Sequence, residues 1–331
     1  MSGQEYPNNL QQMDISNHLL KNANLLKQRM KMDGYLYFSQ ILPVEELFAL
    51  RAKITSVLAD CDWISGGKDK MEARSICMPA REGEEEYFRV HDQLVKVEEL
   101  YRLAQNPKLL EVMKLVLGDG AFPHPLSIIR LVFPNNPEIT TPPHQDFRNN
   151  QGTDQLTAAW IPLSDCPISM GPIAVLKGSH NMGVLPLEFH LGPGNRRATI
   201  TNEVAKLTWV STDFKLGDVL LFPALTVHSA LENRDPERMR LSVDFRYQLE
   251  GEALVEQSLN PHFQRVSWSD IYKTWKNSDL QYYWQTLKFR MVEWDQTLQD
   301  LPDDHLPEAV RLSRKYNVER LSRFQKKADT N

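Results

Sequence analysis

Two histidines and an aspartate in this chain of 331 residues could bind one metal ion. His144 and Asp146 lie in the run Thr141-Pro-Pro-His-Gln-Asp-Phe147, and His228 follows His144 by 84 positions. Residues two apart on an extended segment share a face, so His144 and Asp146 can reach a common ion, and His228 would complete the set from a distant strand. Two histidines and one carboxylate are the ligands that hold Fe(II) by one face and leave its other positions open for oxygen chemistry. The three residues therefore predict an iron oxygenase.

A His-x-Asp tripeptide also arises by chance among nine histidines, so the prediction depends on the surrounding sequence. Twelve residues after His228 begins a segment in which polar and apolar residues alternate: Arg240, Ser242, Asp244 and Arg246 alternate with Leu241, Val243, Phe245 and Tyr247. This pattern predicts a strand with one polar face. For Asp244 and Arg246 we expect an ordinary solvated face.

Arg240 and Ser242 suit a different purpose, because a predicted histidine ligand precedes them at a distance that one short turn can span. A guanidinium binds a carboxylate through two parallel hydrogen bonds, and a neighbouring hydroxyl can donate a third. A 2-oxo acid bound to iron needs such an anchor for its far carboxylate.

With these residues in place, the sequence resembles the phytanoyl-CoA dioxygenase-like Fe(II)/2-oxoglutarate oxygenases from about Gly34 to Tyr247. The resemblance rests on the order and spacing of several matches: Gly34-Tyr-Leu-Tyr-Phe38, His144-Gln-Asp146, Trp160, Gly178-Ser-His180, Gly217-Asp-Val-Leu-Leu-Phe222, His228 and Arg240-Leu-Ser242. It implies a double-stranded β-helix, a jelly-roll of the cupin type, with iron held by His144, Asp146 and His228 and with 2-oxoglutarate and O2 as co-substrates.

The resemblance also implies positions for the co-substrate. Arg240 corresponds to the anchor of the far carboxylate, Trp160 to an aromatic wall beside it, and Ile129 to a residue that lines the same pocket in some members. One departure is Ala230, which stands where the family often has a small hydroxyl residue, two places after the distal histidine. Ser242 is the candidate to supply that hydroxyl.

The implied activity is hydroxylation, or a related oxidation, of a small-molecule or carrier-linked substrate, with succinate and CO2 as co-products. Two alternatives remain open at this point. One is a protein or peptide hydroxylase on the same scaffold. The other is a cupin-like protein that binds a metal or ligand without turnover.

Composition limits the partners of the protein. The formal charge of −5 and the pI near 6.0 argue against nucleic acid as the main partner. No run of eighteen apolar residues and no signal-like start is present, so we expect neither a membrane span nor export. Cys61, Cys77 and Cys166 form no metal or disulfide pattern and suit a reducing cytoplasm. The sequence leaves the oligomeric state open.

The order of predicted elements gives a mainly β domain with flanking helices. Residues 1–16 are expected to be a flexible N-terminus, 17–260 the oxygenase domain with its N-terminal helices, and 261–331 a helical C-terminal extension packed on the barrel. Helical spacing of apolar residues is expected in 47–58 and in 106–118, and short strands fill 127–247. Aromatic-rich helices are expected at 267–276 and 281–298, and a further helix at 307–324, with the aromatic rings packed rather than free to bind substrate.

Overall fold

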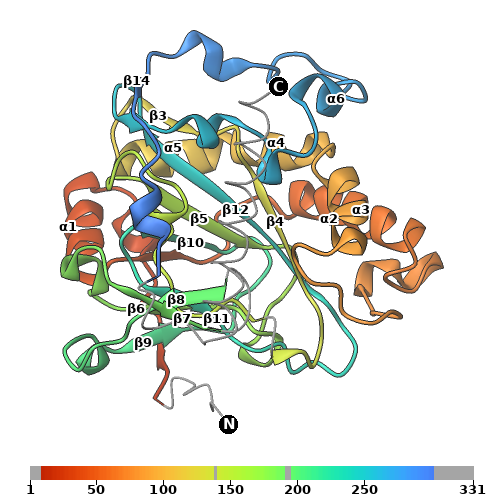
Figure 1. The fold of residues 1–331 in the computed structure, drawn as a ribbon, viewed down its shortest axis with the longest axis horizontal. Helices are drawn as coiled ribbons and strands as arrows, with labels where there is room; N and C mark the ends of the chain where they lie inside the picture. Colours follow the sequence, from red (N-terminus) through yellow and green to blue (C-terminus); the bar gives the residue numbers. More distant parts are fainter. Residues whose placement is uncertain (1–8, 138–139, 191–194, 302–331) are drawn as a thin grey trace, which may run out of the picture.

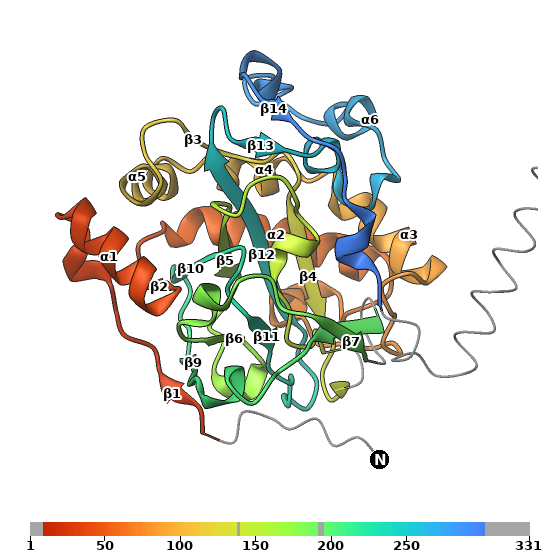
Figure 2. The same cartoon turned by 60° about the vertical axis from the view of Figure 1, so that its left-hand side comes forward.

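Two β-sheets face each other in the computed structural model, which describes residues 9–137, 140–190 and 195–301 (Figures 1 and 2). The larger sheet runs in the order β2 (Leu36–Phe38), β10 (Val219–Pro223), β5 (Thr157–Pro162), β12 (Arg240–Leu249) and β3 (Ala121–Pro123), and β4 (Ile128–Val132) also pairs with β12. The smaller sheet runs β1 (Gln11–Gln12), β9 (Trp209–Ser211), β6 (Ile173–Leu176) and β11 (His228–Ala230). This is the jelly-roll architecture expected from the sequence.

Alternation along the strands divides the apolar residues between two cores. On β5, Ala158 and Trp160 point between the sheets, where they meet residues such as Val175 of β6 and Val210 of β9. The intervening Ala159 and Ile161 belong to a separate cluster on the outer face of the larger sheet. Because side chains on a strand alternate between faces, a shift of one residue would exchange the two sets.

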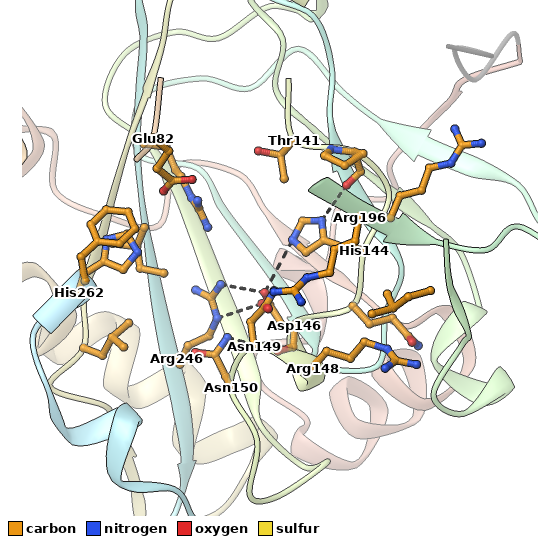
Figure 3. A pocket seen from close by; sticks show the side chains of 18 residues that line it. Glu82, Thr141, His144, Asp146, Arg148, Asn149, Asn150, Arg196, Arg246 and His262 are labelled. Atoms are coloured by element: carbon orange, nitrogen blue, oxygen red, sulfur yellow. Dashed lines mark hydrogen bonds and ion pairs between the residues drawn. The ribbon is translucent and has the colours of Figure 1, made fainter. Parts of the chain in front are cut away.

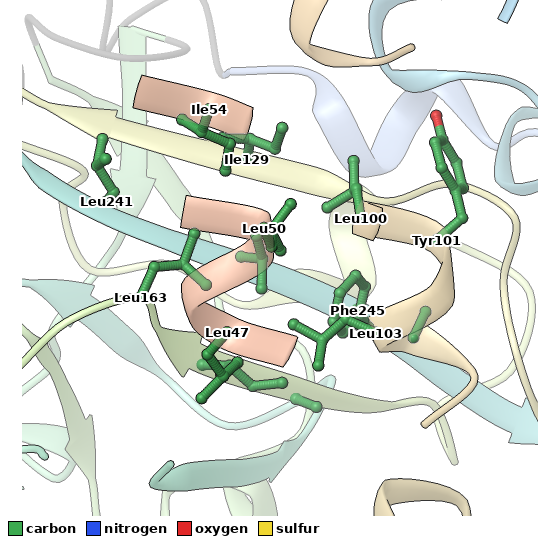
Figure 4. Packing of buried hydrophobic residues seen from close by; sticks show 14 of the residues in the cluster. Leu47, Leu50, Ile54, Leu100, Tyr101, Leu103, Ile129, Leu163, Leu241 and Phe245 are labelled. Carbon is green, nitrogen blue, oxygen red and sulfur yellow. The ribbon is translucent and has the colours of Figure 1, made fainter. Parts of the chain in front are cut away.

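Helices cover that outer face. They are α1 (Ala23–Asp33), α2 (Val44–Asp60), α3 (Glu85–Leu94), α4 (Glu98–Ala104) and α5 (Pro107–Val116). The fully buried Leu47, Leu50 and Ile54 of α2 pack in one cluster with residues of β4 and β12, as Figure 4 shows. Helix α5 begins as its sequence predicts, because the Asn106 side chain accepts hydrogen bonds from the backbone of Lys108 and Leu109.

The N-terminal segment is more ordered than expected. Gln11 and Gln12 pair in parallel with Val210 and Ser211 of β9, and Met13 is buried between the sheets. The prediction of a flexible terminus through residue 16 is therefore wrong for residues 11–13, because pairing with a sheet edge fixes a segment whose polar sequence gives no sign of it.

The C-terminal segment contains less helix than predicted. Helix α6 covers Trp268–Tyr272, but 281–298 holds two short 3-10 turns (Tyr283–Thr286 and Gln296–Gln299) and strand β14 (Arg290–Met291), which pairs with β13 (Ala253–Leu254). Tertiary contacts outweigh helix propensity here, since Tyr283 reaches across to donate to the Pro123 carbonyl. The predicted helix at 307–324 lies outside the described residues.

The aromatic residues of this segment pack as expected. Trp268 and Trp275 contact the ring of Tyr101 on α4, and the Trp275 indole donates to the Lys96 carbonyl. A hairpin of β7 (Leu187–Phe189) and β8 (Arg196–Ala198) completes the described strands. Within the described ranges, no helix combines the length and apolar character that crossing a membrane would require.

The outer core gives a first prediction. Leu50→Ala should lower the free energy of unfolding by about 2–5 kcal/mol, because it removes a fully buried side chain from close packing. Phe48 lies on the same helix but is 50% exposed, so Phe48→Ala should change stability by no more than about 0.5 kcal/mol. Urea denaturation measures both values, and equal losses would contradict the assignment of these faces.

Candidate metal centre

The backbone places His144 and His228 side by side. His144 and His228 exchange two backbone hydrogen bonds, with N to O distances of 2.9 and 3.0 Å, so the segment before Asp146 is paired with β11. The Nε2 atom of each ring lies 3.9 Å from Oδ1 of Asp146, which begins a 3-10 turn (Asp146–Arg148). One ligand atom from each of the three residues lies within 4.8 Å of the others. The predicted triad therefore comes together with a spacing that could hold one ion.

Both histidine rings are oriented by backbone carbonyls. Nδ1 of His144 lies 2.8 Å from the Pro142 oxygen, and Nδ1 of His228 lies 3.0 Å from the Thr226 oxygen. An Nδ1–H that donates to a carbonyl leaves the Nε2 lone pair for a metal. Burial, reinforced by the neighbouring His228, lowers the pKa of His144 to about 3, and burial lowers the pKa of His228 as well. Both rings are thus neutral near pH 7, the form that binds metals.

The third ligand is held by a buried arginine. Nε of Arg246 lies 2.9 Å from Oδ2 of Asp146, and Nη2 donates to Oδ1 at 3.0 Å. Burial by itself would raise the pKa of Asp146, but the charge of Arg246 opposes this effect most strongly and holds the pKa below its usual range. Asp146 is therefore ionised and fixed in orientation before any ion binds.

The polar face of β12 is buried, which corrects the expectation that Asp244 and Arg246 are solvated. Arg246 is 2% and Asp244 is 7% exposed, and Asp244 also pairs with Nε of Arg130 at 2.7 Å. The alternating pattern predicted the strand correctly. The pattern does not show whether the polar face meets water or a protein interior in which charged groups neutralise one another.

A cavity of about 350 Å³ opens beside the triad (Figure 3). Its wall includes His144, Asp146, Arg246 and Arg130, and Arg148, Arg196 and Arg197 also line it. Arg246 was not predicted for this site from the sequence pattern, although its place on the same strand face as Arg240 was a usable signal. His262 and Phe263 were not predicted either, and they line the cavity from beyond the predicted oxygenase domain.

Three of the four residues expected around the co-substrate lie between the sheets. Ser242 Oγ accepts hydrogen bonds from Arg240 Nη1 at 2.7 Å and from Trp160 Nε1 at 3.0 Å. The Arg240 guanidinium lies 5.8 Å from the Trp160 ring centroid, and its Nε donates to the Gly171 carbonyl. These three residues form one buried cluster, although they are not part of the wall of the cavity in Figure 3.

Ile129 does not belong to that cluster. It pairs with Val243, and both point to the helices, where Ile129 packs in the outer core of Figure 4. Its neighbours Ile128 and Arg130 line the cavity instead. Ile129 therefore lies on the opposite face of its strand from the expected pocket, because adjacent residues on a strand point to opposite faces.

Comparison with known proteins identifies a family whose matched region contains the triad. A family model described as phytanoyl-CoA dioxygenase (PhyH) matches residues 30–241, which include the triad. The chain belongs to the phytanoyl-CoA dioxygenase family. Ser242, Arg246 and His262 lie beyond the matched residues of this family member.

A curated relative is the 1-deoxypentalenic acid 11-beta-hydroxylase of Streptomyces exfoliatus, 32% identical over 173 residues. The match covers 48% of this chain and 59% of the relative, so this family member spans about three fifths of the relative's length.

Two solved structures from nogalamycin biosynthesis share the fold. The epimerase SnoN, in complex with Fe3+, alpha ketoglutarate and nogalamycin RO, is 21% identical with a TM-score of 0.52, over 71% of this chain and 86% of SnoN. The alpha ketoglutarate dependent carbocyclase SnoK is 19% identical with a TM-score of 0.51, over 77% of this chain and 92% of SnoK.

The Asp146–Arg246 pair gives a second prediction. In Arg246→Met the carboxyl remains buried but loses its strongest counter-charge, so its pKa should rise. Protons then compete with a metal ion for Asp146. As the pH is lowered, the variant should therefore begin to lose Mn(II) affinity at a higher pH than the parent protein does. Calorimetric titrations with Mn(II) across pH measure this. Arg238→Met is the control, because Arg238 pairs with Asp235 at the surface. Coincident pH profiles for Arg246→Met and the parent would contradict the account.

Proposed function

We propose that this protein is an Fe(II)- and 2-oxoglutarate-dependent dioxygenase that hydroxylates a small molecule. The observation that carries the proposal is the convergence of two neutral Nε2 atoms and one ionised carboxylate beside a cavity. The name of the curated relative, a hydroxylase of an organic acid, supports it. So does the complex of SnoN with iron and alpha ketoglutarate, on the same fold.

The triad fits the metal that this function requires. The histidines present bare nitrogens because their Nδ1 atoms are engaged, and Asp146 presents two oxygens whose orientation Arg246 fixes. Iron bound there would supply the activation of O2, coupled to conversion of 2-oxoglutarate to succinate and CO2. The work of the protein is to bind and orient the reactants and to keep bulk water from the site.

In this proposal, Arg240 anchors the far carboxylate of 2-oxoglutarate. Arg240 is 2% exposed, and its Nη2 has no hydrogen-bond partner among the described residues. Ser242 Oγ accepts from two donors, so its own hydrogen can be donated to a carboxylate. Ser242 would thereby supply the hydroxyl that Ala230 lacks. Arg238, an alternative anchor, is engaged by Asp235 at the surface.

Anaerobic titration of 2-oxoglutarate into the Fe(II) protein tests the function. Chelation by the 2-oxo acid should produce a visible charge-transfer band that saturates at one equivalent, and no band should form in Asp146→Ala. A protein that only stores a metal or another ligand would give no band in the parent, and that result would refute the proposal. A screen for succinate formation stimulated by small molecules then identifies the substrate.

The anchor gives a third prediction. Arg240→Ala should weaken 2-oxoglutarate binding by tens to thousands of fold, because loss of a buried charge contact of this kind costs about 2–5 kcal/mol. Mn(II) affinity should stay close to that of the parent, and Arg240→Lys should recover part of the loss, since lysine cannot make two parallel hydrogen bonds. Arg238→Ala is the matched control. Unchanged 2-oxoglutarate affinity in Arg240→Ala would move the anchor to another residue.

A further inference from the structure

One wall of the cavity comes from residues beyond the part of the chain that matches the family. His262 and Phe263 lie in a 3-10 turn (His262–Gln264) and line the cavity together with His144 and Asp146 of the triad. Figure 3 shows His262 and Arg196 on opposite sides of the cavity, with Asp146 between them. A molecule that fills the cavity would therefore contact this wall while it faces the triad.

His262 is half-buried and is held by a fully buried histidine. Its Nδ1 lies 3.1 Å from Nε2 of His91, which is 1% exposed on α3, and Nδ1 of His91 lies 3.9 Å from a carboxylate oxygen of Asp92. Burial lowers the pKa of His91 to about 4 and lowers that of His262 well below its usual value. Both rings are therefore neutral, and a single hydrogen lies between them.

The carboxylate of Asp92, which Arg265 also binds, lies 3.9 Å from Nδ1 of His91 without a hydrogen bond, and its negative charge biases where the hydrogens reside. It favours a hydrogen on Nδ1 of His91, so Nε2 of His91 is bare and accepts the Nδ1–H of His262. Nε2 of His262 is then bare too. It has no hydrogen-bond partner among the described residues, and the ring borders the cavity. His262 thus offers the cavity a fixed hydrogen-bond acceptor.

The backbone beside His262 is in an unusual conformation. Phe263 and Gln264 have φ angles of +62° and +54°, a region that bulky side chains rarely adopt. The Phe263 ring is packed edge-on against Phe88 and His91, with centroid distances of 5.2 and 4.7 Å. Backbone strain that packing maintains at a cavity wall is typical of residues with a functional role. Phe263 therefore forms a rigid apolar surface next to the acceptor.

Charges near this wall are largely compensated. Arg130 pairs with Asp244 and Arg246 with Asp146, and Glu82 lines the same cavity. Leu126 and Ile128 add apolar surface. Arg148 and Arg196 line the opposite side of the cavity (Figure 3), so the immediate surroundings of His262 favour an uncharged group that can donate a hydrogen bond.

We propose that His262 and Phe263 recognise the substrate, and that this substrate is an apolar molecule with a hydroxyl group that donates to Nε2 of His262. The inference deepens the proposed function, on which it rests for the reaction at the triad. His91 and Asp92 act as positioning residues, because they fix the hydrogen of His262 without contacting the ligand.

Binding of matched probes tests the proposal without turnover. The probes are three alcohols and their methyl ethers: borneol, menthol and 1-adamantanol. Each is titrated into Co(II)-loaded protein saturated with 2-oxoglutarate. NMR detects binding, because the resonances of a probe that lies near Co(II) are broadened. At least one alcohol should bind about tenfold more tightly than its ether, the effect of one hydrogen bond to a buried acceptor. His262→Phe should abolish the difference. His18→Phe, at an exposed histidine, should retain it.

Several results would overturn the inference: no alcohol binds, alcohol and ether bind alike, or His262→Phe keeps the difference. Tighter binding of adamantane-1-carboxylate than of 1-adamantanol, independent of His262, would point to an acid instead. Imidazole 15N NMR of the metal-free parent protein provides a second test, which requires neither a ligand nor a variant that folds. His262 should carry its hydrogen on Nδ1. A hydrogen on Nε2 would show that this atom is not an acceptor and would refute the proposal. The charge-transfer band of the iron protein tests the proposed function separately, so the two can fail independently.

Discussion

The buried ion pair between Asp146 and Arg246 is the interaction on which the site depends. Two charges can be withdrawn from water only if their partners are well placed, and removal of one partner typically costs about 3–5 kcal/mol. Here the pair continues through Asp244 to Arg130, so that the inner face of β12 carries alternating charges up to the candidate metal site. The same ion pairs therefore stabilise both Asp146 and strand β12, whose Arg246 binds it.

The need to place these buried charges beside their partners is consistent with the position of β12 inside the larger sheet, where it has neighbours on both sides. Its inner residues Arg240, Ser242 and Arg246 face the site, and its outer residues pack under the helices. Pairing with β5 on one side and with β3 and β4 on the other fixes its register. A slip by one residue would bury charges among leucines, so the outer core and the site enforce one register together.

Much of this architecture could be predicted from the sequence, because patterns with a period of two or 3.6 residues report which side of an element is apolar. They led to a mainly β domain, to α2 and α5, and to His144 and Asp146 on one face of an extended segment. The jelly-roll was implied by the family resemblance, and His228 by the kind of ligand that the set still needed. Periodicity does not report what lies opposite a polar face, which is why the burial of Arg246 was missed. It also cannot show that a distant segment returns to the site, as His262 does, since only tertiary contacts bring it beside His91.

The central claim is that one ion and one 2-oxo acid share the triad and the Arg240 cluster. A crystal structure of the protein with Mn(II) and 2-oxoglutarate, prepared without oxygen, tests it most directly. We expect the ion to be bound by Nε2 of both His144 and His228 and by Asp146, with the far carboxylate of 2-oxoglutarate on Arg240 and Ser242. An ion elsewhere, a histidine turned away, or the far carboxylate on Arg130 would contradict the account.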